Sequence, residues 1–331
     1  MKYTVLSTLL CLCVSQAALA QTSTPAALAA RGLAAGADYP GLADLCDLSK
    51  PLRIAGERPS DAESRPRPQR ETARTAPEKM PTKVFDNLYF IGNRSVSSWA
   101  LTTDDGVIVI DAMNSSEAAK NHIEEGLLAL DIDPATIKYL IITHGHGDHY
   151  GGQSYLVKKY APRVMMSDPD WRLIERGDAA KLSPRWEAAP SRDITVKDGD
   201  TLSLGNLKLN FYVTPGHTPG TLSLIFPVQD GKRTHYAGLW GGTGLNFGPD
   251  EARIREYSAS ATRFRALANA ANVAIFLSNH ASRDGSVERI EQLKARMPDA
   301  PHPFVNARAS GAFELLADCS LAHAEQLHDR R

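Results

Sequence analysis

Three histidines and an aspartate lie within six consecutive residues of this chain. The stretch has the sequence H-G-H-G-D-H from His144 to His149, and it follows an apolar, β-branched run over residues 138–143 that is typical of a buried strand. Imidazole and carboxylate groups are ligands of catalytic zinc, and glycines let a short loop turn several of them toward one point. An incidental polar turn, the alternative, does not explain four such groups at the end of a strand. The pattern therefore predicts a metal site on a loop that follows a strand.

The composition of the chain limits the kinds of molecule that it can bind. The chain has 331 residues, is 43% hydrophobic and carries a formal net charge of -1. This content is enough for a sizeable core, in one α/β domain with extensions or in two domains. Because positive and negative residues are interspersed, the chain offers no basic surface for nucleic acid. We therefore expect a small-molecule substrate and no nucleic-acid partner, and the sequence does not indicate an oligomeric state.

Residues 1–20 have the pattern of a cleavable signal peptide. A basic residue precedes an apolar run over residues 5–14, and small residues stand at Ala18 and Ala20, where signal peptidase favours them. The apolar run is shorter than the roughly 20 residues that a membrane-spanning helix needs. We therefore expect a periplasmic or secreted protein without a membrane anchor, beginning near Gln21.

An N-terminal extension over residues 21–82 precedes the predicted catalytic domain at residues 83–331. Residues 22–48 are rich in Ala and Leu and predict one or two short helices. Residues 51–82 contain six prolines among arginines and glutamates, a composition that cannot fold a core alone and is typical of a linker.

Strands and helices follow one another in two similar series within the domain. The first series is predicted to comprise strands over 84–91, 98–103, 107–111, 138–143 and 163–166, with helices over 115–130, 151–160 and 168–176. The second is predicted to comprise strands over 201–204, 207–213, 221–226, 234–237 and 273–277, with helices over 252–271, 287–297 and 310–327. Two such halves predict two packed sheets with helices outside, which is a four-layer αββα sandwich of the α/β class.

Two further histidines follow predicted strands in turn-like settings. His217 lies in T-P-G-H-T-P-G-T and His280 in L-S-N-H-A-S, so five of the ten histidines would share one face. We expect the others on the surface: His122, His235, His302, His323 and His328.

Together, H-x-H-x-D-H, the P-G-H-T-P-G-T turn and a late strand-end histidine resemble the metallo-β-lactamase superfamily, over about residues 83–308. The resemblance implies the αββα fold and a zinc-dependent hydrolase. Nitrogen-rich ligation without a thiolate also favours zinc. By resemblance, each of two Zn²⁺ ions has three ligands in this chain: His144, His146 and His217 for the first, and Asp148, His149 and His280 for the second.

Departures from the superfamily pattern indicate a subclass. Many members, such as glyoxalase II-like enzymes, lactonases and tRNA-processing nucleases, have an Asp that bridges both metals just after the strand that here runs from His235 to Gly238. This chain has no carboxylate there until Asp250. The first and second metallo-β-lactamase subclasses place a Cys on the second zinc, and no cysteine lies near a site segment here. The chain therefore resembles the third subclass, although a Gly-rich turn over residues 241–246 replaces its usual serine-containing turn.

The resemblance and the zinc chemistry assign roles to single residues. Asp148 is expected to orient the attacking hydroxide and take up its proton as well as to bind zinc. Asp111 resembles the family's Asp beneath the site, a plain strand-end turn being the alternative. Substrate contacts are predicted for Tyr150, Trp171, Trp240, Thr243 and Asn246.

Removal of the signal peptide leaves Cys46 and Cys319 as the two cysteines of the mature chain. In an oxidising compartment they suggest a disulfide between the extension and the last helix, worth up to a few kcal/mol. Two buried free thiols are the alternative, since spacing does not fix pairing.

The leading expectation is an exported zinc hydrolase that opens a cyclic amide, as in β-lactam hydrolysis. Hydrolysis of a lactone, an ester or another amide at the same site is the first alternative. A non-catalytic zinc-binding protein is the second, which the presence of a full ligand set argues against.

Overall fold

The computed structural model describes residues 24–54, 80–177 and 186–331. The predicted signal peptide and most of the proline-rich segment lie outside these residues. Among the described helices, none is both long enough and apolar enough to span a membrane.

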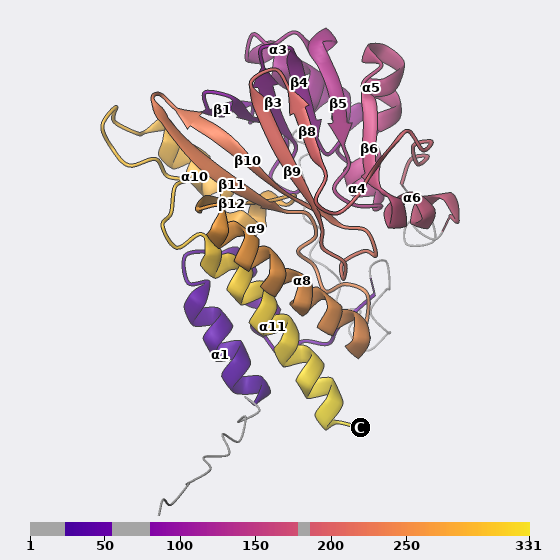
Figure 1. The fold of residues 1–331 in the computed structure, drawn as a ribbon, viewed down its shortest axis with the longest axis vertical. Helices are drawn as coiled ribbons and strands as arrows, with labels where there is room; N and C mark the ends of the chain where they lie inside the picture. The colour runs from indigo at the N-terminus through magenta and orange to yellow at the C-terminus, as the bar shows by residue number, and fades with distance from the viewer. Residues whose placement is uncertain (1–23, 55–79, 178–185) are drawn as a thin grey trace, which may run out of the picture.

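Seven strands form the first sheet, in the order of the sequence (Figure 1). They are β1 (Thr82–Phe85), β2 (Leu88–Phe90), β3 (Trp99–Thr103), β4 (Gly106–Ile110), β5 (Ile137–Ile141), β6 (Arg163–Ser167) and β7 (Ile194–Val196). The pairs from β1 to β4 are antiparallel, and those from β4 to β7 are parallel. The parallel half brings the carboxyl ends of β4, β5 and β6 to one edge, where polar loops follow each strand.

Five strands form the second sheet, in the order β12-β11-β10-β9-β8. Their bounds are β8 (Thr201–Leu204), β9 (Leu207–Val213), β10 (Leu222–Asp230), β11 (Arg233–Trp240) and β12 (Val273–Ser278). All pairs are antiparallel except β11 with β12, which are parallel because α8 (Glu251–Ala270) connects them. This crossover places the ends of β11 and β12 side by side.

The two sheets bury their facing sides against each other. Leu101, Ile108 and Ile141 of the first sheet share one buried cluster with Leu224, Phe226 and Leu239 of the second. Apolar residues on both inner faces explain why neither sheet is stable alone.

Helices cover the outer face of each sheet. The first sheet carries α2 (Ser116–Ala118), η3 (Ala119–Glu124), α3 (Glu125–Ala129), α4 (Gly147–Tyr150), α5 (Gln153–Tyr160) and α6 (Asp168–Glu175). The second carries α8 and α11 (Ser310–Asp329), whereas α9 (Ala281–Asp284) and α10 (Ser286–Lys294) pack on the cluster between the two sheets. Helix, sheet, sheet and helix make four layers, so the predicted αββα sandwich is confirmed.

The first part of the extension packs on the last helix. Helix α1 (Pro25–Ala35) begins where the Thr24 side chain accepts a hydrogen bond from Ala27 N, and η1 (Pro40–Cys46) follows it. Figure 1 shows α1 alongside α11, which itself lies beside α8. Gly32 allows this close approach, because a Cβ there would lie 2.5 Å from Cys319 Sγ. A disulfide joins Cys46 to Cys319, the pairing that the sequence suggested.

Three histidines expected on the surface are buried, which corrects the prediction for His122, His302 and His323. Nε2 of His302 lies 2.8 Å from the Val84 carbonyl, and Nε2 of His323 lies 3.0 Å from the Leu45 carbonyl. A neutral imidazole that donates to a buried carbonyl gives both groups a hydrogen bond, so the ring can be buried without leaving either group unpaired. His122 lies in η3, whose wide π-helical turns bury three consecutive residues from His122 to Glu124.

Candidate metal centre

Loops from both sheets meet at one edge of the sandwich. The loop after β5 carries His144 and His146, and the short helix α4 that follows it carries His149. The loop between β9 and β10 carries His217, and His280 follows β12. Backbone hydrogen bonds hold these loops together, with Leu222 N donating to Thr143 O at 2.7 Å and Ser97 N donating to Asn279 O at 2.9 Å. The sandwich thus brings together residues that are 137 positions apart, counted from Thr143 to His280.

Three buried ring nitrogens converge on the first metal position. Nε2 of His144 lies 3.1 Å from Nδ1 of His146 and 3.1 Å from Nε2 of His217. Four-coordinate zinc with Zn–N bonds of about 2.0–2.1 Å separates its ligand atoms by roughly 3.3 Å. The spacing of the three nitrogens therefore fits a tetrahedral ion, with one position left for another ligand.

Backbone carbonyls orient two of these rings. Nδ1 of His144 lies 2.8 Å from Gly241 O, and Nδ1 of His217 lies 2.7 Å from Gly244 O. Each Nδ1 can then donate its hydrogen to a carbonyl, and the Nε2 lone pair points at the metal position. The Gly-rich turn after β11 therefore supports the first set of ligands, a role that the sequence did not reveal.

Asp148, His149 and His280 surround the second position. Oδ2 of Asp148 lies 3.3 Å from Nε2 of His149 and 3.8 Å from Nε2 of His280. Nδ1 of His149 lies 2.8 Å from Asp111 Oδ2, and Nδ1 of His280 lies 2.9 Å from Ser95 O. Nε2 of His149 is buried without a hydrogen-bond partner in the described part of the chain. A buried nitrogen of this kind is costly unless a metal uses its lone pair, so the residues fit a second ion.

Burial and mutual repulsion set the protonation of this cluster. Burial and the neighbouring imidazoles hold the pKa values of His144 and His217 well below the usual range, and burial lowers the pKa of His146 to about 4. Burial opposes a charge on His149 as well, but Asp148 and Asp111 outweigh it and raise its pKa to about 10. Burial likewise disfavours the Asp148 carboxylate, yet His149 and other histidines lower its pKa. His144, His146 and His217 as neutral imidazoles and Asp148 as a carboxylate are in the forms that bind metal, whereas His149 has to lose a proton when metal binds.

Asp170 was not predicted, yet it ties two histidine loops together. Its buried carboxylate accepts hydrogen bonds from Gly145 N at 2.8 Å, Thr218 Oγ1 at 2.7 Å and Gly220 N at 2.8 Å. Burial raises the pKa of Asp170 to about 6, although these three donors favour the ionised form. Asp170 lies in the first turn of α6, where an acidic residue is common on any helix, so its sequence position carried no signal.

Arg253 was also not predicted and secures the His217 loop from α8. Its guanidinium donates to the carbonyls of Gly216, at 2.6 Å, and His217. Only the tertiary fold brings α8 against this loop, so no local motif marked the arginine.

Three predicted substrate contacts are wrong. Tyr150, Trp171 and Trp240 are buried in the helix-covered cores. Nε1 of Trp171 donates to Ile194 O at 3.0 Å, and Nε1 of Trp240 donates to Gly242 O at 2.8 Å. Apolar packing on one side and a satisfied N–H on the other leave these rings no face toward a substrate.

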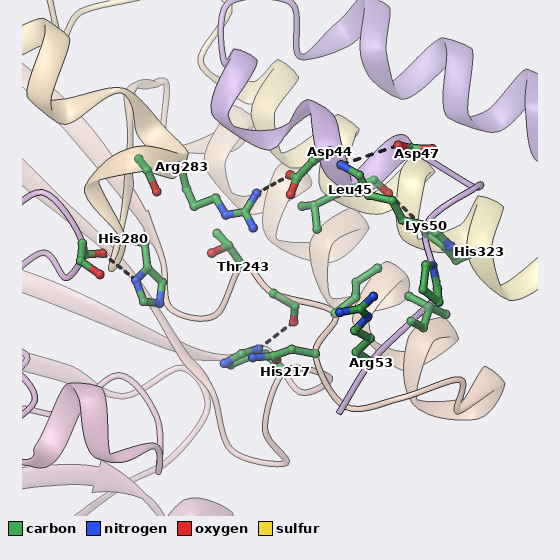
Figure 2. A pocket seen from close by; sticks show the side chains of 17 residues that line it. Asp44, Leu45, Asp47, Lys50, Arg53, His217, Thr243, His280, Arg283 and His323 are labelled. Carbon is green, nitrogen blue, oxygen red and sulfur yellow. Dashed lines mark hydrogen bonds and ion pairs between the residues drawn. The ribbon is translucent and has the colours of Figure 1, made fainter. Parts of the chain in front are cut away.

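A cavity of about 660 Å³ lies beside the metal centre. Thr243 and Asn246, two further predicted contacts, line it together with His217 and His280. Figure 2 shows that residues of the extension, Asp44 to Arg53, form another part of its wall. The extension therefore shapes the pocket rather than only preceding the domain.

One family model matches part of the chain. The model of the metallo-β-lactamase superfamily matches residues 91–230, which include the H-x-H-x-D-H loop and His217. Over these residues the chain is similar to the metallo-β-lactamase superfamily. The similarity is to a superfamily of metallo-hydrolases, and the histidine cluster has the ligand types of a metal site.

Solved structures of similar fold are metallo-β-lactamases. One is BJP-1, a subclass B3 enzyme of Bradyrhizobium japonicum, at 24% identity, a TM-score of 0.59, and coverage of 77% of this chain and 93% of that chain. Native FEZ-1 from Legionella gormanii has 22% identity, a TM-score of 0.62, and coverage of 77% and 95%. A Cronobacter sakazakii metallo-β-lactamase with a HARLDQ motif has 26% identity, a TM-score of 0.63, and coverage of 77% and 91%.

A curated protein of similar sequence is named as a hydrolase of another kind and not as a β-lactamase. The hydroxyacylglutathione hydrolase of Nitrobacter hamburgensis is 32% identical over 130 residues, 38% of this chain and 44% of that protein. The chain thus spans less than half the length of the curated relatives of this kind that it matches.

Proposed function

We propose that this protein is an exported β-lactamase whose site holds two Zn²⁺ ions. The observation that carries the proposal is the composition of the two ligand sets, which contain five histidines and Asp148, with neither a thiolate nor a bridging carboxylate. That composition matches the subclass to which the sequence pattern pointed, and similar folds occur in subclass B3 β-lactamases.

The backbone after β11 also argues against a bridging carboxylate. A Cβ on Gly241 would lie 1.9 Å from Leu222 O, and a Cβ on Gly242 would lie 2.7 Å from the His217 ring. Neither position accepts a side chain unless the site rearranges. The site therefore departs from the glyoxalase II-like pattern, although sequence relatives carry that name.

Zinc bound in such a site supplies a Lewis acid for a carbonyl oxygen and makes a water molecule acidic enough to deprotonate near neutral pH. The protein contributes orientation. Asp148 is ionised and lies beside His149, and its carboxylate can accept a hydrogen bond from the attacking water, which would fix the direction of attack. The rings of His144, His146 and His217 are buried, and His217 also lines the cavity through which we expect the substrate to enter.

The second candidate is hydrolysis of an ester, thioester or lactone. The identity to hydroxyacylglutathione hydrolases over 130 residues favours it, since the same ligands can present water to another acyl group. Which type of bond the protein hydrolyses therefore has to be determined with a panel of substrates.

A substrate panel separates the candidates. Zinc-loaded mature protein would be assayed with nitrocefin and a carbapenem, beside S-lactoylglutathione, a homoserine lactone and an aryl ester, each with and without chelator. The proposal predicts that chelator-sensitive turnover is fastest for a β-lactam. Turnover of S-lactoylglutathione or the lactone alone would replace β-lactam hydrolysis with the second candidate.

Export rests on residues 1–20 and on the disulfide, which is typical of an oxidising compartment. N-terminal sequencing of protein from a periplasmic fraction should find a start near Gln21. Full-length protein confined to the cytoplasm would contradict export.

A further inference from the structure

The wall of the cavity that the extension builds is anchored at several points. Cys46 is bound to Cys319, and Asp44 pairs with Arg283, which also donates to Gly41 O. At the other end of the segment, Gly248 N donates to Arg53 O at 3.2 Å, and Ile54 forms an isolated bridge with Phe247. Residues 44–54 are therefore held against the loop that follows β11, and they lie outside the segment that the family model matches.

Charges along this wall are compensated except at one residue. Arg283 is paired with Asp44, and Lys50 Nζ lies 3.6 Å from Asp47 Oδ2. The exposed guanidinium of Arg53 has no hydrogen bond or ion pair within the described ranges 24–54, 80–177 and 186–331. Figure 2 shows Arg53 and His217 among the side chains that line the cavity. Among the described residues, the wall thus presents one cation without an anion to neutralise it.

A second polar group in the same cavity is also unused. The Thr243 hydroxyl is buried and has no hydrogen-bond partner among the described residues. Thr243 lies one residue before Gly244, whose carbonyl orients His217. A buried hydroxyl without a partner is uncommon in proteins, and a ligand oxygen at this place would satisfy it.

We propose that Arg53 is a specificity-determining residue that binds the carboxylate of the substrate, with Thr243 as a second donor. The identity of the substrate in this inference rests on the proposed function. Arg53 would select β-lactams that carry a carboxylate beside the reactive amide. The guanidinium offers two parallel N–H donors that match a carboxylate, and its backbone is fixed to the loop that supports the first metal ligands. The Gly-rich turn, residues 241–246, contains no cationic side chain, so the extension supplies the cation.

The test compares an acid with its ester. Steady-state kinetics would be measured on the zinc-loaded protein with a chromogenic cephalosporin as the free carboxylate and as its methyl ester. Arg53→Ala should raise KM for the acid by about tenfold, change KM for the ester less than twofold, and leave kcat and zinc content unchanged. Arg53→Lys keeps the positive charge but loses the two parallel N–H donors of the guanidinium. Its KM for the acid should lie between those of the parent and of Arg53→Ala.

Lys50→Ala is the matched control. It removes the same charge from the same segment, but Asp47 already compensates Lys50, so KM for the acid should change less than threefold. The inference is overturned if Arg53→Ala leaves the ratio of acid to ester KM unchanged. An equal increase in KM for the acid in Lys50→Ala would also overturn the inference. The cause would then be the summed electrostatic field of the charges in the wall and not a direct contact with Arg53.

A binding measurement keeps this inference separate from the proposed function. Calorimetry with 3-mercaptopropionate and its methyl ester uses a thiolate to anchor on zinc and needs no turnover. The acid should bind the parent about tenfold more tightly than the ester, and Arg53→Ala should abolish that preference. If no β-lactam is hydrolysed but this preference depends on Arg53, the proposed function fails and the anion site stands. If the preference persists in Arg53→Ala, the anion site is wrong whatever the substrate.

Discussion

Asp111 Oδ2 lies 2.8 Å from Nδ1 of His149, and both side chains are buried. The same carboxylate accepts hydrogen bonds from Thr143 N at 2.8 Å and Thr143 Oγ1 at 2.9 Å. Asp111 follows β4 and Thr143 follows β5, so one carboxylate connects two strand ends to a metal ligand. It fixes His149 with Nδ1 as the donor and leaves Nε2 for the metal position.

Asp111→Asn should weaken the second zinc more than the first. The amide keeps the shape but loses the charge and one acceptor, and losses of this kind typically lower metal affinity about 10- to 100-fold. Zinc titration against a competing chelator would measure both affinities. Asp105→Asn, on an exposed turn, is the control. Two zinc ions bound as tightly as in the parent would contradict the role of Asp111.

Asp148→Ala should leave the protein with one zinc. The first set of ligands does not include Asp148, so His144, His146 and His217 should still bind their ion. Activity should fall by at least about 100-fold, because a ligand and the group that orients the attacking water are both lost. Metal analysis after gel filtration tests this directly. A stoichiometry of two zinc ions in the variant would show that the second set is wrongly assigned.

Asp170 should make the metal-free protein less stable as pH rises from about 4 to 6. Burial raises its folded pKa to about 6, above the ordinary 3.8, so in this window the folded state holds a proton that the unfolded state has released. Stability from this group is therefore full below pH 4 and lost as pH approaches 6, by up to about 3 kcal/mol.

Comparison with Asp170→Asn isolates that contribution, because the buried histidines titrate in both proteins. The free energy of unfolding of the parent minus that of the variant should decrease between pH 4 and 6. Urea denaturation at several pH values measures the difference. A constant or increasing difference would mean that Asp170 stays ionised and that its three donors outweigh burial.

The Cys46–Cys319 disulfide should stabilise the fold without affecting metal binding. It closes a loop with a sequence separation of 273, and loop entropy for so long a loop predicts a loss of up to about 5 kcal/mol when it is removed. The Cys46→Ser/Cys319→Ser variant should therefore unfold at lower urea concentration yet retain the zinc content of the parent. Equal stability, or two free thiols in the unreduced parent, would contradict this account.

Local signals account for what could be predicted from the sequence. His144, His146, Asp148 and His149 stand in one loop after an apolar run, so their shared chemistry was visible without a fold. The alternation of strands and helices was enough to predict the two sheets, because each element buries its own apolar face. His217 and His280 could be added because each also follows a strand.

Long-range contacts account for what could not be predicted. Asp170 and Arg253 act on the histidine loops across 25 or more residues, through hydrogen bonds that no motif encodes. Trp171 and Trp240 looked like pocket walls because tryptophan serves both pockets and cores. His302 and His323 looked exposed because their carbonyl partners, Val84 and Leu45, are more than 200 residues away.

The proposed enzyme uses two zinc ions to hydrolyse β-lactams. The most direct test is to titrate the metal-free mature protein with zinc and to follow nitrocefin hydrolysis at each addition. The account predicts that activity rises to a plateau at two equivalents and disappears when a chelator is added. A protein that binds two equivalents of zinc and hydrolyses no β-lactam would contradict it.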